Sequence, residues 1–585
     1  MRNILVIDSI KIKEKIIRKY SISREIAGDI AEDYLESSVE VIEKKGYLIC
    51  HYDMEFKEIE NIINKYSNNI DKEIDLIKAS IIYAIEDDAK KNGNVFMYYD
   101  IFEKRVKKLL AKKVIKEKFH KALEELKSES EIIIENDCNG NLCVYVSRLY
   151  RGEVELSNAL TEIISNNNTI NDERIEKFIN GYAEIKLEKK QKEAIAVALK
   201  NNISIINGMA GTGKTTVIKV IIKAMKKIFQ FNKIMILGYT GKSVQRAMEV
   251  TNLEAEGNTI HRFLGIDEKG RIKRNSKIKL DVLILDESSM VDITLMNMLL
   301  SSIECSKIIF TGDYGQLPSI KEGQIFKDLI LSKLIPTVKL EKIIRQKEGN
   351  IILENSKKIN LGIGFEESAK GLKEKKKQFE FEECETKDIK KKVIKTIEGL
   401  IKNDIDIYDI KVMSAIREGI NGVKDLNKKI IDEFNPINGR EVSKLAVLDN
   451  VMAVKNNYDK NIFNGENGII IRTEGDNFKG LKKVKVKFGE NKIVEYNDDE
   501  INELELAYAT TIHKMQGSEV PVAIIIVDNE KVLTRELLYV AVSRAKERVI
   551  MIGNKGAFNN GLKVTVNRNS MLVERIQDSM KKRMA

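Results

Sequence analysis

The sequence predicts an α/β fold with parallel sheets in two separate lobes. From about residue 183, short apolar segments alternate with helical patterns, as in ISIIN, IMILGY, VLILDE and KIIFTGD. A second region of this kind begins near residue 337 and closes with the apolar segments VAIIIVD and RVIMIG. Such alternation is typical of parallel strands joined by crossover helices.

The length and composition indicate a globular protein of several domains. A chain of 585 residues exceeds what one hydrophobic core supports, so three or four domains are expected. The 43% hydrophobic and 32% charged residues exclude the disordered and membrane classes. The net charge, 99 − 89 = +10, is compatible with a polyanionic partner but does not require one. Five scattered cysteines favour a reducing cytoplasm.

Changes in residue pattern divide the chain into five expected units. In chain order these are a helical region at 1–90, a winged-helix-like region with a strand pair at 91–182, a first lobe at 183–336, a second lobe at 337–469 and 506–585, and a β-rich insert at 470–505. The charged stretch GLKEKKKQFEFEECETKDIKKK is expected to form a solvated helix and loop.

A glycine-rich loop, GMAGTGKTT (208–216), indicates a nucleotide site. It follows the apolar segment SIIN and precedes a helix with an apolar stripe, which is the context that G-x-x-x-x-G-K-[ST] requires. There the glycines let backbone N–H groups surround phosphates, Lys214 reaches the β and γ oxygens, and Thr215 holds Mg²⁺. The expected nucleotide-binding residues are Gly208, Ala210, Gly211, Thr212, Gly213, Lys214, Thr215 and Thr216. A purely structural glycine turn is the alternative.

Acidic and amide side chains follow two further strands of the first lobe. VLILDESSMVD delivers Asp286 and Glu287 at the carboxyl end of a strand, where ligands of open α/β sheets bind. Asp286 suits the metal, and Glu287 suits the polarisation of an attacking water. Gln316, just past KIIFTGD, is placed to touch the γ-phosphate and to sense its loss. The alternative is two ordinary strand ends.

Two arginines of the second lobe are candidates to complete the site. Arg345 lies in LEKIIRQ and Arg544 in YVAVSRAKERV. A guanidinium at a γ-phosphate accelerates hydrolysis by about 10³- to 10⁵-fold. Because the chain carries 99 basic residues, the competing interpretation of either arginine is an ordinary surface residue.

These motifs, in this order, resemble the superfamily 1 DNA helicases of the RecD-like branch. The similarity runs from LEKKQKEAIAVAL (187–199) to LLYVAVSRAKERVIMIG (537–553). It implies two RecA-like P-loop lobes, an SH3-like insert, and ATP and Mg²⁺ as cofactors. It further implies that Gln191 reads the adenine and that Gly517 and Glu519 close on the nucleotide from the second lobe.

The sequence also departs from this family. ISREIAGDIAEDYLESSVEVIEKKGYLI resembles the helix-hairpin-helix region of stand-alone RecD-like helicases. The hairpin glycines that would let backbone amides meet a phosphate are missing, which argues against DNA binding by residues 1–90. The family's Ala-Pro before Thr-Gly is replaced in LGYTGKS.

The tripeptide Thr-Ile-His occurs twice, in NTIHRFLGI and ATTIHKMQGSE, although the chain has only four histidines. Helicases of this family hold single-stranded DNA with both lobes, and hydroxyls and amides suit contacts that do not read the base sequence. The candidate DNA-binding residues are Thr240, Thr259, His261, Thr511 and His513. Chance recurrence is the alternative. GIDEKGRIKRNSKIK (265–279) is either a strand-separating hairpin or an ordinary surface hairpin.

The sequence therefore predicts an ATP-dependent helicase that moves on single-stranded DNA, 5′→3′ by resemblance, and separates duplex DNA. Two alternatives stay open: a DNA-stimulated ATPase, translocase or regulatory subunit without unwinding activity, and a Pif-type helicase. The expected partners are single-stranded and duplex DNA, without a membrane, and the family implies a monomer.

Overall fold

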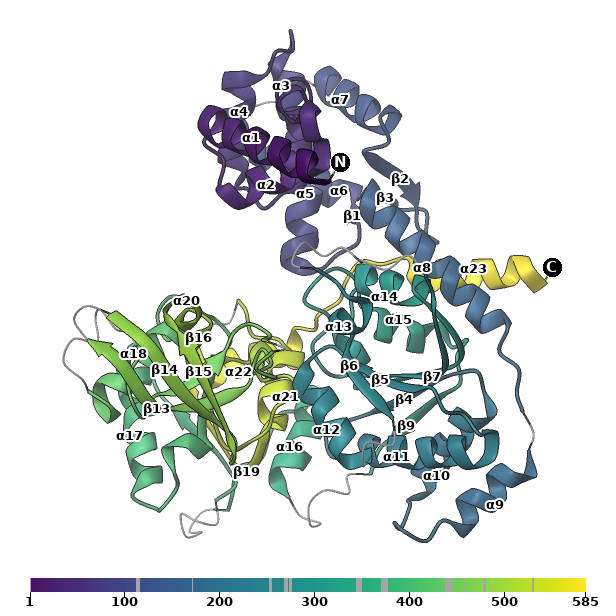
Figure 1. The fold of residues 1–585 in the computed structure, drawn as a ribbon, viewed down its shortest axis with the longest axis vertical. Helices are drawn as coiled ribbons and strands as arrows, with labels where there is room; N and C mark the ends of the chain where they lie inside the picture. Colours follow the sequence, from purple (N-terminus) through teal and green to yellow (C-terminus); the bar gives the residue numbers. More distant parts are fainter. Residues whose placement is uncertain are drawn as a thin grey trace.

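The computed structural model shows two α/β lobes side by side, with the N-terminal region above the first lobe (Figure 1). The described residues are 2–111, 116–170, 172–251, 255–267, 272, 276–342, 350–369, 377–436, 445–457, 459–476, 480–528 and 531–584. No helix within these ranges is both long enough and apolar enough to cross a membrane.

The N-terminal region is helical, as the sequence predicts. Its first five helices are α1 (Arg2–Tyr20), α2 (Arg24–Tyr34), α3 (Ser38–Lys44), α4 (Phe56–Tyr66) and α5 (Lys72–Asn92). The next elements are β1 (Met97–Tyr98), α6 (Tyr99–Leu110), α7 (Lys116–Ser128), β2 (Ile132–Asn136), β3 (Leu142–Val146), α8 (Ser147–Ser165) and α9 (Glu173–Gly181). Strands β2 and β3 form the predicted hairpin, and the antiparallel sheet has the order β1-β3-β2.

The first lobe is a six-stranded parallel sheet of order β6-β5-β7-β8-β4-β9. Its strands are β4 (Ile203–Gly208), β5 (Ile234–Gly238), β6 (Glu256–Thr259), β7 (Ile278–Asp286), β8 (Ile303–Gly312) and β9 (Thr337–Leu340). Its helices are α10 (Lys189–Lys200), α11 (Lys214–Ala224), α12 (Gly241–Thr251), α13 (Ile260–Leu264), α14 (Ile293–Ser301) and α15 (Ile325–Ser332). The four strands predicted from apolar segments are β4, β5, β7 and β8.

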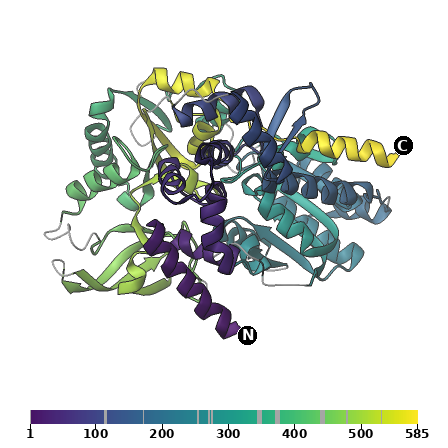
Figure 2. The same ribbon diagram turned by 90° about the horizontal axis from the view of Figure 1, so that it is seen from above.

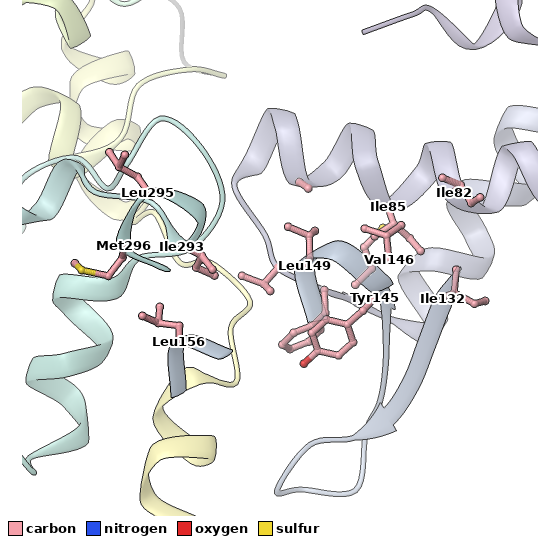
Figure 3. Packing of buried hydrophobic residues seen from close by; sticks show 14 of the residues in the cluster. Ile82, Ile85, Ile132, Tyr145, Val146, Leu149, Leu156, Ile293, Leu295 and Met296 are labelled. Atoms are coloured by element: carbon pink, nitrogen blue, oxygen red, sulfur yellow. The ribbon is translucent and has the colours of Figure 1, made fainter. Parts of the chain in front are cut away.

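One hydrophobic core joins the N-terminal region to the first lobe. It extends from Ile85 on α5 through Tyr145 on β3 and Leu149 on α8 to Ile293 and Met296 at α14 (Figure 3). A separate core fills the opposite face of the first-lobe sheet. Because the shared core is continuous, the N-terminal region and the first lobe form one packed body.

The second lobe is a five-stranded parallel sheet of order β10-β19-β18-β11-β17. Its strands are β10 (Phe379–Glu383), β11 (Ile410–Ser414), β17 (Ala509–Thr511), β18 (Val520–Val527) and β19 (Ala545–Gly553). Its helices are α16 (Ile351–Asn360), α17 (Ile389–Ile401), α18 (Val423–Phe434), α21 (Arg535–Ser543) and α22 (Lys555–Lys563). Hydrophobic cores cover both faces.

Strand β10 corrects the expectation of a solvated helix and loop in GLKEKKKQFEFEECETKDIKKK. Within this stretch, β10 pairs in parallel with β19 at the edge of the sheet. Phe379 and Phe381 are buried, and the glutamates between and after them are partly or fully exposed. The alternation in FEFEE has the period of two that a half-buried strand requires, and the surrounding lysines obscured it.

The β-rich insert is a five-stranded antiparallel sheet of order β15-β14-β13-β12-β16 with its own core. Its strands are β12 (Asn450–Ala453), β13 (Asn467–Asp476), β14 (Gly480–Phe488), β15 (Lys492–Asn497) and β16 (Leu504–Leu506), and helix α20 (Asp498–Ile501) lies between β15 and β16. The sheet therefore begins before residue 470, the expected start of the insert, because β12 pairs with both β13 and β16.

The C-terminal end of the chain leaves the second lobe, although 506–585 is expected to belong to it. Helix α23 (Leu572–Met584) lies beside elements of the N-terminal region and the first lobe (Figure 2). Leu572 and Ile576 are fully buried in the core that these two parts share. On this return path, Ser570 Oγ lies 3.0 Å from Asp328 Oδ2 and 2.9 Å from Glu153 Oε1.

We expect Asp328→Asn to change the pH dependence of stability. Burial raises the pKa of Asp328 from 3.8 to about 7, so its proton is retained on folding. This contribution to stability is fully present below pH 3.8 and is lost as the pH rises through 7. Between pH 5 and pH 8 the wild type should lose on the order of 2 kcal/mol of unfolding free energy relative to the variant, measured by chemical denaturation. Parallel pH profiles for the two proteins would contradict this expectation.

Candidate active site between the two lobes

The glycine-rich loop between β4 and α11 is shaped to surround an anion. Gly211 and Gly213 have φ angles of +82° and +84°, which side chains rarely adopt. Behind the loop, Thr212 is fully buried, and its hydroxyl donates to Met209 O at 2.8 Å. A Cβ at Gly208 would lie 2.6 Å from Thr212 Oγ1. Gly208 and Thr212 therefore shape the loop from behind its exposed face.

Lys214 and Gln191 lie at two sides of this loop. Lys214 Nζ donates to Gly208 O at 2.6 Å, so the ammonium stays at the loop. The Gln191 side chain is buried; its Nε2 donates to Thr212 O at 3.2 Å, and its Oε1 accepts from Glu188 N at 3.1 Å. These two bonds fix the orientation of the Gln191 amide against the loop.

Asp286 and Glu287 stand at the carboxyl end of β7. Thr311 Oγ1 donates to Asp286. Burial and the charge of Glu287 raise the pKa of Asp286, while the Thr311 hydroxyl and the Lys214 ammonium oppose the increase. Glu287 has a φ of +51°, and its buried Oε2 has no hydrogen-bond partner among the described residues. Strained backbone and an unsatisfied buried acceptor are both typical of functional sites.

Gln316 is held beside these carboxylates by Asp313. The backbone N–H of Gln316 donates to Asp313 O at 3.1 Å, and its Nε2 lies 3.5 Å from Asp313 Oδ2. Gln316 Oε1 is a second buried acceptor with no partner in the described part of the chain. The hydroxyl of Tyr539, from α21 of the second lobe, donates to Asp313. A contact between the lobes thus supports the Gln316 loop.

The second lobe supplies the opposite wall of one cavity of about 300 Å³. Arg544, just after α21, is 4% exposed, and it donates to Val540 O, Ser518 O and Ser543 Oγ. The predicted residues that line this cavity are Gln191, Ala210, Gly211, Gly213, Lys214, Thr215, Thr216, Asp286, Glu287, Gln316, Gly517, Glu519 and Arg544. Arg345 lies outside the described residues.

Two basic residues of α12 face the second lobe and had no role assigned from sequence. Arg246 lines the cavity, and its guanidinium lies 3.2 Å from Glu519 Oε1. Lys242 Nζ donates to Ser518 Oγ at 3.1 Å, and burial lowers the pKa of this lysine. Lys242 and Arg246 are four residues apart on the helix begun by YTGKSVQRAM, so they share one face. The four-residue spacing of these two basic side chains was the sequence signal that could have identified them.

The two Thr-Ile-His tripeptides occupy equivalent places in the two lobes. Each begins at the end of a sheet-edge strand, β6 or β17. Thr259 Oγ1 accepts the N–H of Arg262, and Thr511 Oγ1 accepts the N–H of Lys514, both at 3.3 Å. Thr259 thus caps helix α13, which carries His261, and Thr511 Oγ1 accepts a hydrogen bond from within the short turn that carries His513.

The other predicted DNA-binding residues lie near these turns. The ring of His261 packs edge-on against Tyr239, with centroids 5.7 Å apart. Desolvation and the charge of Arg568 lower the pKa of His513. Thr240 Oγ1 lies 3.1 Å from Ser243 Oγ. The predicted hairpin at 265–279 lies partly outside the described residues; within them, Ile266 and Ile272 form an antiparallel bridge.

Two protein families match separate parts of this chain. Residues 186–376 match the AAA domain family, and residues 506–552 match the UvrD-like helicase C-terminal domain. An uncharacterized protein, MJ1519 of Methanocaldococcus jannaschii, is 31% identical over 78% of this chain and 45% of its own length. The RecBCD enzyme subunit RecD of Buchnera aphidicola is 28% identical over 71% of this chain and 80% of its own length.

A third relative is the ATP-dependent RecD2 DNA helicase of Deinococcus radiodurans, 29% identical over 67% of this chain and 52% of its own length. The chain is similar to the RecD-like branch of the superfamily 1 helicases. It spans about half the length of two of these three relatives. A solved Pif1 helicase from Bacteroides, in complex with ADP-AlF3 and ssDNA, has a TM-score of 0.41 and 20% identity, covering 63% of this chain and 92% of that one.

The residues of this RecD-like site fit a nucleotide with Mg²⁺. Among the described residues, no group of three His, Cys, Asp or Glu side chains could hold a metal ion. Mg²⁺ in phosphate sites commonly takes one or two protein ligands together with phosphate oxygens and waters. Thr215 and Asp286 would supply those ligands, and the unpartnered Glu287 Oε2 and Gln316 Oε1 could accept hydrogen bonds from bound water.

Lys214→Ala and Glu287→Gln should separate nucleotide binding from hydrolysis. The alanine variant loses the ammonium at the phosphate loop, so its affinity for a fluorescent ATP analogue should fall. The glutamine variant keeps the shape of the side chain but cannot accept a proton, so it should bind the analogue normally and hydrolyse ATP about 10²- to 10⁴-fold more slowly. Normal turnover by Glu287→Gln would exclude this residue as the base.

Proposed function

We propose that this protein is an ATP-dependent helicase that moves on single-stranded DNA and separates duplex DNA. One observation carries the proposal: Lys214 and Arg544 come from different lobes and line the same cavity. Nucleotide binding and lobe position must then affect each other, because one ligand contacts both walls. The name of the RecD2 relative, an ATP-dependent DNA helicase, supports the same activity.

The residues divide the work of hydrolysis between the lobes. On the first lobe, Lys214 and Thr215 hold the phosphates, and Glu287 orients and deprotonates the attacking water. Asp286 and Thr215 would hold Mg²⁺, which neutralises charge on the β- and γ-phosphates when bound. From the second lobe, Arg544 stabilises the charge that develops on the transferred phosphoryl group. Arg345 is proposed to act with it.

The two capped turns would let this cycle move the protein. Each lobe has one proposed DNA-binding turn at an edge of its sheet: Thr259 with His261 on the first lobe, and Thr511 with His513 on the second. Thr240 would add a contact on the first lobe. If the two turns bind alternately as the lobes close and part, each ATP hydrolysed advances the protein along one strand. We expect 5′→3′ movement, by a monomer in the cytoplasm.

Matched tailed duplexes test this function. We expect wild-type protein to hydrolyse ATP faster with single-stranded DNA and to unwind a duplex with a 5′ tail, while Lys214→Ala does neither. Unwinding is measured by release of a fluorescent strand. ATPase stimulation without strand release would favour the translocase alternative, and release from 3′-tailed duplexes alone would contradict the polarity.

Threonine-to-serine variants separate DNA contact from helix capping. Thr259→Ala and Thr511→Ala each lose a cap worth about 0.5–2 kcal/mol, and they also lose the hydroxyl proposed to meet a phosphate. Thr259→Ser and Thr511→Ser keep both functions and serve as controls. We expect the alanine variants to bind labelled oligo-dT more weakly than the serine variants. Alanine variants that are less stable but bind normally would restrict these hydroxyls to capping.

A further inference from the structure

The chain crosses back from the second lobe to the first within two residues. Val566 N donates to Glu536 Oε2 of α21 at 3.1 Å, so Val566 is still attached to the second lobe. The guanidinium of Arg568 already binds the first lobe. Two residues span at most about 7 Å. The lobes therefore cannot separate at this point unless an attachment breaks or the structure around Arg568 moves.

Arg568 is enclosed by the loop that follows Gln316. Its Nη1 donates to Lys321 O and Gly323 O, both at 2.6 Å, and to Ser319 Oγ at 2.9 Å. Its Nη2 donates to Ser319 O at 2.6 Å. Within the described ranges, no carboxylate forms an ion pair with this arginine. Desolvation lowers its pKa to about 10, and the charges of Glu322, Asp292 and Asp328 oppose the decrease.

The N-terminal region closes the third side of this junction. Gly93 has a φ of +71°, and a Cβ there would lie 2.2 Å from Arg568 Cζ. Gly93 O accepts the N–H of Gly323 at 2.9 Å, and Asn569 O accepts the N–H of Val95 at 2.8 Å. Arg568 is thus packed between a loop of the first lobe and a helix end of the N-terminal region.

The loop that binds Arg568 begins at the nucleotide cavity and ends close to the two Thr-Ile-His turns that are proposed to bind DNA. At its start, Asp313 contacts Gln316 and receives a hydrogen bond from Tyr539 of the second lobe. At its end, Ser319 to Gly323 bind Arg568. Desolvation lowers the pKa of both His261 and His513; the charge of Lys321 adds to this at His261, where Asp292 opposes it, and the charge of Arg568 adds to it at His513. The junction therefore lies within electrostatic reach of the histidines of both capped turns.

We propose that Arg568 is a positioning residue that couples movement of the second lobe to the loop carrying Gln316. The second lobe holds this loop at both ends, through Tyr539 and through the short crossover from Val566 to Arg568. Lobe closure then moves the loop as a unit and aligns Gln316 with the γ-phosphate. An arginine suits this place because its planar fork reaches several carbonyls at once, which an ammonium does less well. This inference rests on the proposed function.

Arginine variants of the full chain test the coupling. We expect Arg568→Ala to lower the DNA-stimulated kcat for ATP hydrolysis tenfold or more, because loosening the loop misplaces Gln316, and to leave the KM for ATP within about twofold of wild type. Arg568→Lys should recover part of the loss. Asn567→Ala is the matched control: Asn567 lies in the same crossover, where its Oδ1 accepts from Lys327 Nζ at 3.0 Å, and among the described residues it forms no hydrogen bond with Ser319 to Gly323. It should keep wild-type kinetics.

A second variant guards against a folding defect. Ser319→Ala removes one acceptor of Arg568 and leaves the crossover intact, so it should lower the stimulated kcat in the same direction by a smaller factor. Lower thermal stability with wild-type DNA stimulation in both Arg568→Ala and Ser319→Ala would make the junction merely structural and overturn the inference alone. A wild-type ATPase that DNA does not stimulate would contradict the proposed function, and this inference with it.

Discussion

Everything in this structure depends on one constraint: the nucleotide site is divided between two separately folded sheets. Lys214 at the phosphate loop and Arg544 after α21 face one cavity of about 300 Å³. Each lobe has a hydrophobic core of its own, and a further core of the second lobe also takes in Leu317 of the first. A ligand with several negative charges can therefore draw the two walls together, since it meets basic side chains from both lobes.

The direct contacts between the lobes are both apolar and polar. Leu317 of the first lobe is buried in a core of the second lobe, and Met209 of the phosphate loop packs against the same core. Arg246 pairs with Glu519 in a partly exposed position, and such pairs contribute about 0–1 kcal/mol. Lys242 and Tyr539 add single hydrogen bonds to Ser518 and Asp313.

The N-terminal region and α23 belong mechanically to the first lobe. The continuous core across α5, α8 and α14 is reinforced by Arg148, which pairs with Glu86 and Glu322, and by Arg575, which pairs with Glu153. The second lobe is joined to this body by the chain between β9 and α16 and again by the crossover at Val566. Two connections restrict the directions in which the lobes can part.

The sequence by itself determined the parts whose chemistry is local. We could predict the phosphate loop, the strand that ends in Asp286 and the four apolar strands of the first lobe, because each is defined by a short run of consecutive residues. Tertiary structure decided what depends on distant segments: the edge strand β10 hidden in a lysine-rich stretch, the pairing of Arg246 with Glu519, and the return of the C-terminal chain that puts Arg568 beside Gly93. Those contacts join residues hundreds of positions apart, and only the packing of the lobes determines which side chains meet.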